Sequence, residues 1–262
     1  MTMKQGNGYN HKLPDIDELT RQYVTEELSA GIIAKKYNVT KGAVLIKLRR
    51  YGIPRRSLTD AQRLTGNRID ITPGLYDFMA GLLLGDGSLV LAQTGKSARY
   101  SHTDKHRSYL VWLKKELSSF GIKCSTPKTY TSGATYSISS THYREFVALK
   151  KEWYPFGERK IPHNLVLSPI KVFNWFIGDG STVYHKNKLR VPRVRISKWY
   201  DKEGVERMST QLIAMDISNT VEKDGLYIRT NSVDRFFKYL LSSGLSIPNC
   251  YKYKFPEEFL HE

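Results

Sequence analysis

The stretch at residues 76–88, YDFMAGLLLGDGS, decides the fold, because the chain repeats its pattern at residues 169–181 as PIKVFNWFIGDGS. Each stretch is an apolar segment long enough for a few helical turns, and each ends in Gly-Asp-Gly-Ser. Two such segments in one chain indicate an internal repeat, in which each copy places one aspartate after a helix.

The positions of those aspartates, Asp86 and Asp179, are unfavourable for an isolated carboxylate. A glycine after the last helical residues is a typical C-cap, so Gly87 and Gly180 are expected to end the two helices. An aspartate there faces the negative end of the helix dipole, which costs about 0.3–1 kcal/mol. Since the chain makes this choice twice, the simplest compensation is a divalent cation shared by the two carboxylates.

The first copy carries a family resemblance. The segment MAGLLLGDG at 79–87 resembles the LAGLIDADG motif of homing endonucleases at Ala80, Gly81, Leu82, Asp86 and Gly87. The segment VFNWFIGDG at 172–180 resembles a more diverged copy that keeps the Asp-Gly pair. Shorter matches extend the resemblance over residues 73–256; they lie at 153–155, 160–162, 168–169, 247–248 and 253–254.

The resemblance implies an activity and a cofactor. Single-chain members with two motifs are site-specific DNA endonucleases, which make a staggered double-strand break by Mg²⁺-dependent phosphodiester hydrolysis. Mn²⁺ or Ca²⁺ are the expected substitutes for Mg²⁺ in binding. The implied metal-site residues are Asp86 and Asp179, with Gly85 and Gly178 before them. A catalytic lysine near each site is also implied. The candidates are the Arg159-Lys160 pair for one site and Lys252 or Lys254 for the other, and motif context favours Lys160 and Lys254.

The chain departs from the family pattern in two ways. An acidic residue that often stands two positions before the metal-binding aspartate is replaced by Leu84 and Ile177. In the second copy, Phe173 and Asn174 replace small residues of the helix contact face. Gly81 and Gly85 are four residues apart on one helical face, as are Asn174 and Gly178, so each helix still has a glycine where the two backbones must approach.

Composition agrees with a nucleic-acid partner. Forty-one Lys and Arg residues against 25 Asp and Glu give a net charge of +16, an excess typical of proteins that bind polyanions. Two distant cysteines, Cys124 and Cys250, form no zinc spacing and no disulfide framework, which fits a reducing compartment. The polar N-terminus is not a signal peptide, and no apolar run approaches 18 residues. We therefore expect a cytoplasmic, nucleoid-associated protein.

The first 60 residues are predicted to form a separate all-α unit with a disordered start, followed by a linker at 61–72. Expected helices cover 15–28, a segment capped by Ser29, and a segment from 41 to 51 capped by Thr40. The pattern at 33–44 resembles a helix-turn-helix, whose second helix enters the major groove. An ordinary helical hairpin with a solvated basic face is the alternative. The DNA contacts expected here are Lys41, Lys47, Arg49, Arg50, Arg55 and Arg56.

Residues 73–165 and 166–262 are predicted to be two comparable halves. In each, the order is helix, two strands, helix, two strands, helix, with a hairpin turn at Asp224-Gly225 in the second. The expected fold class is therefore α+β, and the resemblance implies a pseudo-twofold LAGLIDADG saddle of two αββαββα-like halves. Since both halves are in one chain, a monomer on an extended double-stranded DNA target is expected.

Basic side chains alternate with other residues along the predicted strands of the second half. Val194 and Ile196 are expected to face the core while their neighbours face DNA, as a β-surface in the major groove requires. A solvated strand face is the alternative. The expected contacts are Lys96 and Arg99 in the first sheet, with Gln93 and His102 beside them, and Lys186, Lys188, Arg190, Arg193, Arg195 and Lys198 in the second.

The sequence leaves two other functions open. Helix-turn-helix units and LAGLIDADG-like scaffolds also occur together in transcriptional regulators that bind DNA without cutting it. A maturase that binds its own intron RNA is the second alternative. Both aspartates are retained, which favours cleavage, and the sequence shows no nucleophilic triad, Walker loop or dinucleotide-binding fingerprint.

Overall fold

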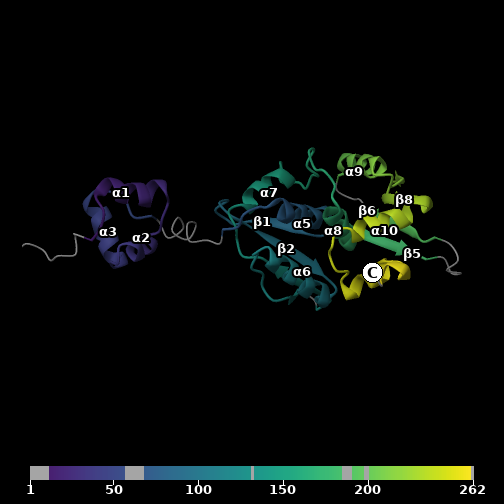
Figure 1. Cartoon of the computed structure of the whole chain (residues 1–262), viewed down its shortest axis with the longest axis horizontal. Helices are drawn as coiled ribbons and strands as arrows, with labels where there is room; N and C mark the ends of the chain where they lie inside the picture. Colours follow the sequence, from purple (N-terminus) through teal and green to yellow (C-terminus); the bar gives the residue numbers. More distant parts are fainter. Residues whose placement is uncertain (1–11, 57–67, 131–132, 185–190, 198–200, 261–262) are drawn as a thin grey trace, which may run out of the picture. The chain divides into compact units, whose positions relative to one another are not determined.

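The computed structural model describes residues 12–56, 68–130, 133–184, 191–197 and 201–260, and divides the chain into two compact units, Met1–Gly66 and Asn67–Glu262 (Figure 1). Each unit has its own hydrophobic core. Some expected features lie outside the described residues, namely the start of the chain, residues 61–67 of the predicted linker, Lys186, Lys188, Arg190 and Lys198.

The first unit is helical, and short polar side chains set its helix starts. The side chains of Asp15, Ser29 and Thr40 accept hydrogen bonds from backbone N–H groups three residues on, at 2.9, 3.2 and 3.2 Å. The helices are α1 (Ile16–Thr20), a π-helical turn (Arg21–Thr25), α2 (Ala30–Lys36) and α3 (Lys41–Arg50). The expected first helix is divided, because α1 passes into the π-helical turn after Thr20, and the helical path ends before Glu27, whose φ is 55°.

The connection between α2 and α3 is a tight turn in which Asn38 adopts a φ of 49°, a conformation that asparagine tolerates. The buried side chains of the unit are Leu13, Leu19, Tyr23, Ala30, Ile33, Ala34, Val44 and Leu48. Both helices of the turn therefore contribute to one small core, and Val39 is partly buried against it.

The second unit contains the repeat. Its first half runs α5 (Pro73–Leu84), β1 (Ser88–Leu91), β2 (Ala98–Asp104), α6 (Arg107–Ser119), β3 (Lys128–Tyr130), β4 (Thr135–Ser139) and α7 (Phe146–Trp153). Its second half runs α8 (Pro169–Asp179), β5 (Gly180–Val183), β6 (Arg193–Ser197), α9 (Lys202–Ala214), β7 (Asn219–Val221), β8 (Gly225–Ile228) and α10 (Val233–Leu241). Short 3₁₀ helices lie at Thr230–Ser232, Asn249–Lys254 and Glu257–Phe259.

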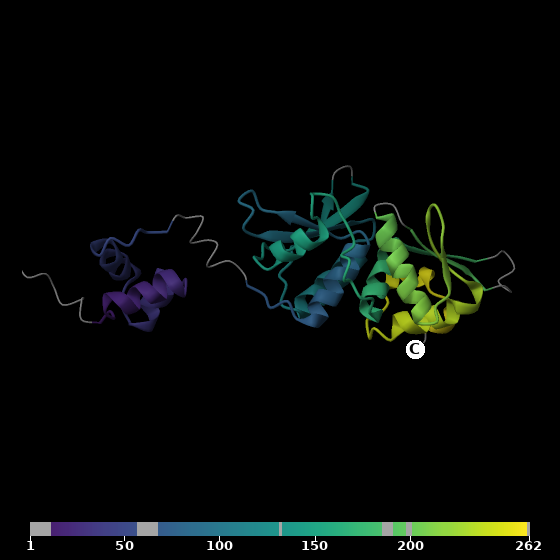
Figure 2. The same cartoon turned by 90° about the horizontal axis from the view of Figure 1, so that it is seen from above.

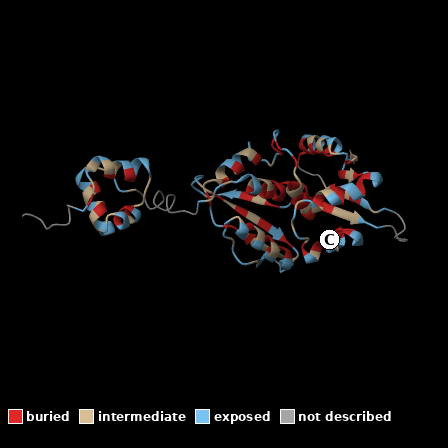
Figure 3. Ribbon diagram, viewed as in Figure 1, coloured by how far each residue is buried: buried red, intermediate tan, exposed pale blue. Residues whose placement is uncertain are grey.

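The two sheets have the same topology. Their antiparallel strands lie in the orders β1-β2-β4-β3 and β5-β6-β8-β7, so each strand of one half has an equivalent in the other. Burial alternates along β2, where Ala98, Tyr100, His102 and Asp104 are buried and the residues between them are more exposed. The β2 ribbon accordingly alternates between red and paler colours in Figure 3. The α+β fold and the internal repeat are therefore confirmed.

The motif helices α5 and α8 lie side by side in both views (Figures 1 and 2). Their backbones approach at glycine. A Cβ built on Gly81 would lie 2.8 Å from the Cβ of Asn174 and 2.8 Å from the Lys171 carbonyl oxygen. Further along, a Cβ built on Gly178 would lie 3.2 Å from the Cα of Gly85. The distances at Gly81 leave no room for a larger residue unless the backbone moves.

A buried ion pair and aromatic packing support the crossing of the helices. The Lys171 ammonium of α8, 5% exposed, pairs with the Asp77 carboxylate of α5. Nearby, a cluster of rings has centroids 5.5–6.1 Å apart; its members are Phe173, Phe176, Phe237 and Phe255. Within the described segments of the chain, no helix is both long and apolar enough to cross a membrane.

Candidate active site

The two motif helices end differently. Helix α8 continues to Asp179 with Gly180 as its cap, at the expected position, whereas α5 ends at Leu84 with Gly85 as its cap, two residues earlier than expected. Neither Gly87 nor Gly180 has a positive φ, so neither forms a left-handed cap. Gly87 is needed for space instead: a Cβ there would lie 2.6 Å from the Leu82 carbonyl oxygen and 2.8 Å from the Tyr100 ring.

The close helix contact brings the two aspartates to one place. Asp86 follows α5, and its Oδ2 lies 3.7 Å from the point where a Cβ on Gly178 would stand, one residue before Asp179. Burial, and next the charge of Asp86, raise the pKa of Asp179 to about 7. Two carboxylates from different halves therefore share one electrostatic environment.

Lys254 supplies positive charge to this environment from the 3₁₀ helix Asn249–Lys254. Its side chain is 5% exposed, and its Nζ donates hydrogen bonds to the carbonyl oxygens of Ile177 and Gly178 at 2.6 and 3.3 Å. Burial lowers the pKa of Lys254 to about 8, although the carboxylates of Asp86 and Asp179 oppose that shift. The lysine thus holds the last turn of the second motif helix.

Arg159 occupies the equivalent position in the first half. Its guanidinium donates to the carbonyl oxygens of Gly85 at 2.6 Å and Gly87 at 2.5 Å, on either side of Asp86. The structure gives Arg159 the place for which the sequence favoured Lys160. The lysine is exposed, because consecutive side chains in an extended segment point in opposite directions. Lys252 is also exposed, beside Tyr184 and Tyr253.

A buried polar cluster that the sequence did not reveal lies behind Asp86. His102, 2% exposed, is 2.8 Å through Nδ1 from the hydroxyl of Tyr100, whose ring contacts the Gly87 position. Burial lowers the pKa of His102, while the charges of Asp86 and Asp104 act in the other direction. Its place on the inner face of β2 corrects the expectation that His102 faces DNA.

The same cluster ties the halves together. The hydroxyl of Tyr251, from the 3₁₀ helix Asn249–Lys254, donates to the Asp104 carboxylate of β2. The indole N–H of Trp112 in α6 donates to the Ser246 hydroxyl at 3.0 Å. The sequence contained a signal for this cluster, because His102 and Asp104 stand at positions of β2 that face the core. The contact itself could not be predicted, because Tyr251 lies 147 residues further along the chain.

The outer face of the second sheet carries a short row of polar side chains. In β6, Arg193 and Arg195 point outward while Val194 and Ile196 are buried, in agreement with the expected alternation. Arg195 pairs with Asp224 at 2.6 Å, and the guanidinium of Arg193 lies 4.4 Å from the centroid of the Tyr227 ring. Both arginines are thus held by neighbours on β8 or in the turn before it.

The outer face of the first sheet is rich in hydroxyl groups instead. Cross-strand neighbours on this face are Ser88, Ser101 and Ser139 in one row and Thr103, Ser137 and Lys128 in the next. Arg99 lies on the same face and is partly buried, and Lys96 is exposed in the β1–β2 loop. The two sheets therefore present different chemistry from equivalent positions.

The basic residues of the first unit divide into two groups. Lys47 donates from Nζ to the Pro14 carbonyl oxygen at 2.7 Å. Arg56 donates to the Leu28 carbonyl oxygen at 2.8 Å and stacks on the Tyr23 ring at 3.8 Å. Both therefore hold the unit together, which their positions in the sequence did not show. The exposed members are Lys41, Arg49, Arg50 and Arg55.

The described residues contain no cluster of three or more His, Cys, Asp or Glu side chains that could hold a metal ion by themselves. Any cation at the helix ends would therefore be held by the two aspartates together with oxygens of other kinds. The neighbouring carbonyl oxygens of Gly85 and Gly178 are of the required hard type.

Comparison with known proteins decides the family. The sequence model of the LAGLIDADG DNA endonuclease family matches residues 76–236, more than half of the chain. The chain belongs to the LAGLIDADG DNA endonuclease family. The uncharacterized protein MJ1098 of Methanocaldococcus jannaschii is 30% identical over 177 residues, which are 65% of this chain and 67% of that protein.

Solved structures of LAGLIDADG proteins share the fold. The homing endonuclease I-WcaI bound to its DNA recognition sequence matches with a TM-score of 0.60 and 16% identity, over 77% of this chain and 93% of that chain. I-DmoI in complex with DNA and Ca matches with a TM-score of 0.47 and 16% identity, over 71% and 95% of the chains, too low a likeness to support an argument. The fold of the second unit is thus that of a LAGLIDADG homing endonuclease.

Proposed function

We propose that this protein is a site-specific endonuclease that makes a staggered double-strand break in DNA by Mg²⁺-dependent hydrolysis. The observation that carries the proposal is the meeting of Asp86 and Asp179 at the ends of two helices in glycine-to-glycine contact. The family supports DNA as the substrate, and the pairing of one carboxylate from each half supports cleavage of both strands.

The helix ends suit a hard divalent cation. Among the described residues, no side chain donates a hydrogen bond to the carboxylate of Asp86 or of Asp179, so their oxygens are available as ligands. The pKa of Asp179 is raised first by burial and next by the charge of Asp86, and a cation beside the two carboxylates would favour the charged form of both. The carbonyl oxygens of Gly85 and Gly178 each have a second lone pair beyond the hydrogen bond that they accept. A bound Mg²⁺ would activate water and neutralise charge on the scissile phosphate.

Lys254 and Arg159 are proposed as positioning residues. Each donates to the last carbonyl oxygens of a motif helix, so each fixes the backbone on which an aspartate stands. Their positive charges also offset the negative ends of the two helix dipoles, close to the place where phosphate charge would develop. Lys160 and Lys252, both exposed, are better suited to contacts with the DNA backbone than to the reacting atoms.

DNA is proposed to lie along the outer faces of both sheets. Arg193, Arg195 and Arg99, with the hydroxyl groups of the first sheet, supply contacts to phosphates and base edges. The first unit is proposed to add a helix-turn-helix contact through its exposed basic residues Lys41, Arg49, Arg50 and Arg55. One chain already contains both halves, and α8 occupies the face of α5 that a second copy would need, so we propose a monomer.

Cleavage of the DNA at the protein's own insertion locus tests this function. Asp86→Asn and Asp179→Asn each remove one ligand charge without changing side-chain size. We expect both variants to bind the target specifically and to lose double-strand cleavage in Mg²⁺, on gels of a plasmid that carries the locus. Asp234→Asn is the matched control, because Asp234 is 69% exposed in the first turn of α10.

Each remaining part of the proposal has a result that would contradict it. Normal cleavage by both single variants would exclude the metal assignment. Tight, specific binding by the unaltered protein without cleavage in Mg²⁺ or Mn²⁺ would favour a non-cleaving regulator. Preference for the surrounding intron RNA over the duplex would favour a maturase. A homodimer in light scattering at micromolar concentration would contradict the monomer.

A further inference from the structure

Helix α3 of the first unit presents an apolar surface to solvent in a segment otherwise rich in charge. Val44 and Leu48 face the small core, and the opposite side carries Ile46, which is 63% exposed. Gly42 and Arg49 stand four residues before and three residues after Ile46, so the three share one side of the helix. A single exposed isoleucine is ordinary on a solvated helix, so Ile46 suggests a contact surface only together with the apolar residues that adjoin it.

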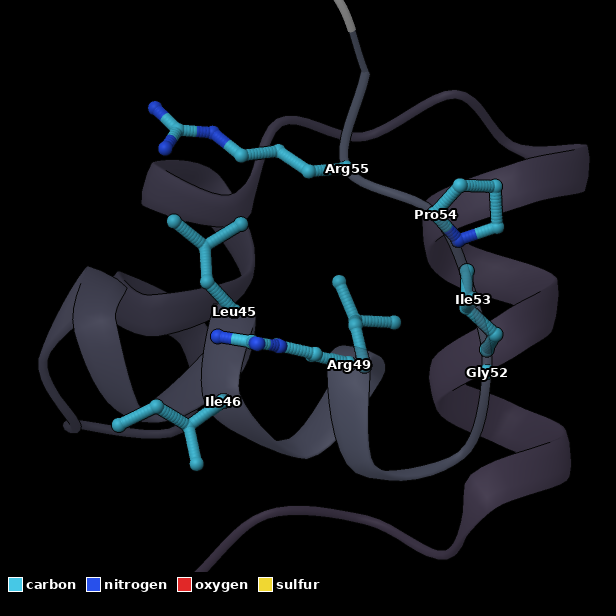
Figure 4. Close-up of a pocket in the computed structure, with 8 residues that line it drawn as sticks. Leu45, Ile46, Arg49, Gly52, Ile53, Pro54 and Arg55 are labelled. Atoms are coloured by element: carbon cyan, nitrogen blue, oxygen red, sulfur yellow. The ribbon is translucent and has the colours of Figure 1, made fainter.

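A hollow of about 560 Å³ extends this surface beyond the end of α3. Apolar parts of Leu45, Ile46, Ile53 and Pro54 line it, together with Arg49 and Arg55. Figure 4 shows the side chains of Arg49 and Arg55 extending toward the same side, with Leu45 between them in that view. The hollow therefore has apolar walls and two guanidinium groups at its border.

The charge around the hollow selects one class of occupant. The segment at 39–56 contains no acidic residue, and its six basic residues are Lys41, Lys47, Arg49, Arg50, Arg55 and Arg56. The acidic residues of the described part of this unit are instead at 15–27, on α1 and the π-helical turn or next to them. An apolar centre within a basic border complements a polyanion with apolar groups inside it.

The major groove of DNA has this arrangement. Phosphates line its two edges, and each thymine places a 5-methyl group on its floor, where apolar side chains make their base-specific contacts. Gly42 has open space beside its Cα, with only the Thr40 hydroxyl 3.8 Å from a built Cβ, so the start of α3 can approach the bases closely. A helix of this kind enters the groove with its N-terminal residues nearest the bases.

We infer that the Gly42–Leu45–Ile46 surface of α3 recognises the 5-methyl groups of a thymine-containing major groove, with Arg49, Arg50 and Arg55 on the flanking phosphates. The inference rests on the proposed DNA binding by the first unit and goes beyond it, because it names the bases and the chemical group. Lys47 and Arg56 take no part, since both donate hydrogen bonds within the unit.

The test uses the full-length chain and a target duplex selected from randomised double-stranded DNA. Each thymine in the site is replaced in turn by deoxyuridine, which removes only the 5-methyl group. We expect the affinity to depend on the methyl groups of one or two thymines outside the region covered by the second unit. Each of those replacements should weaken binding about fourfold, as expected for one buried methyl group. The same duplexes are then measured with Ile46→Ala.

Ile46→Ala should weaken binding to the thymine duplex and reduce the effect of those deoxyuridine replacements, because the methyl groups lose their most exposed apolar partner while Leu45 remains. Replacements elsewhere in the site should keep their effect. Ile32→Ala is the matched control, because Ile32 is 52% exposed on α2 and lies outside the hollow. This replacement should leave both the affinity and the deoxyuridine effects unchanged. Arg49→Gln with Arg50→Gln should weaken binding to all duplexes alike and reduce its salt dependence.

Separate outcomes identify which idea fails. If the arginine variant weakens binding but the deoxyuridine effects are the same with and without Ile46→Ala, the first unit binds DNA and the thymine contact is overturned. If the arginine variant also binds normally, DNA binding by the first unit fails, and the thymine contact is overturned with it. Cleavage by the saddle, measured on the same duplexes, is independent of both results.

Discussion

At the scale of single residues, the site depends on which of two neighbouring side chains points inward. Arg159 and Lys160 are adjacent and both basic, yet only Arg159 donates to the carbonyl oxygens around Asp86. Motif context located this position to within one residue, because the sequence shows spacing but not the direction of a side chain in an irregular segment. Motif context also favoured Lys254 over Lys252, and of the two only Lys254 is buried beside the end of α8.

Lys254→Met is predicted to destabilise the protein by about 1–3 kcal/mol, because the buried carbonyl oxygens of Ile177 and Gly178 lose their donor. The free energy of unfolding from urea titration measures the effect. Lys160→Met, at an exposed position, is the control and should stay within about 0.5 kcal/mol of the original. Equal stability of the two variants would mean that Lys254 does not hold the end of α8.

At the scale of elements, the sequence predicted the order of helices and strands in both halves, and the structure follows that order. Hydrophobic spacing and turn residues are local signals, so they are legible in the sequence of each element. The end of the first motif helix was predicted two residues too late. Helix α5 stops at Leu84, because contacts with Tyr100 and Arg159 set the path of the chain there. The buried contact between Asp104 and Tyr251 was missed for the same reason, because tertiary structure creates it.

Gly81→Ala is predicted to lower the free energy of unfolding by about 1–3 kcal/mol, because the new methyl group would overlap the backbone of Lys171 where α5 and α8 meet. Thermal unfolding followed by circular dichroism measures the effect. Gly74→Ala in the first turn of the same helix is the control: its Cβ would lie 3.7 Å from the Phe120 ring, and alanine there favours the helix. If Gly81→Ala melts at the original temperature, the helices do not approach at that residue.

The outward arginines of β6 are predicted to contribute affinity rather than cleavage. Arg193→Gln with Arg195→Gln should weaken binding to target DNA and, to a smaller extent, to non-target DNA. It should also reduce the slope of log affinity against log salt concentration by up to about 0.9 for each phosphate that the variant no longer binds. Fluorescence anisotropy at several salt concentrations measures both. Arg235→Gln on α10, 56% exposed, is the control. An unchanged slope would show that DNA does not lie on this strand.

At the scale of the whole molecule, the chain has two units with separate cores. The two aspartates and the cationic side chains beside them all belong to the second unit, so the proposed chemistry needs nothing from the first. The first unit, tethered to the second, would raise the local concentration of a second DNA contact. The family could be anticipated from the sequence, because it depends on motifs; the division of the basic residues into internal and exposed groups could not, because it depends on carbonyl oxygens far along the chain.

Deletion of residues 1–60 is therefore predicted to shorten the protected DNA on one side only, to weaken binding and to leave the cut positions unchanged. Footprinting and mapping of the cleaved ends on the same duplex, with a binding titration, measure the three effects. The salt dependence of binding should also become shallower, because fewer counterions are released. An unchanged footprint would assign the first unit to some other partner.

The Arg195–Asp224 pair gives the second sheet a property that its charge alone would not provide. A protein with a net charge of +16 meets phosphate everywhere along a genome, and loose attraction to all of it would delay the search for one site. Asp224, at the tip of the β7–β8 hairpin, already neutralises Arg195 at 2.6 Å, and it also accepts a hydrogen bond from Tyr227 at 2.8 Å. A random stretch of duplex gains little by displacing Asp224 from Arg195, because it loses one ion pair to form another. A duplex that fits the whole surface offsets the loss of this ion pair through its other contacts with the protein. If DNA lies on this face as proposed, the Asp224 carboxylate would shorten the time that the protein stays bound to DNA of the wrong sequence.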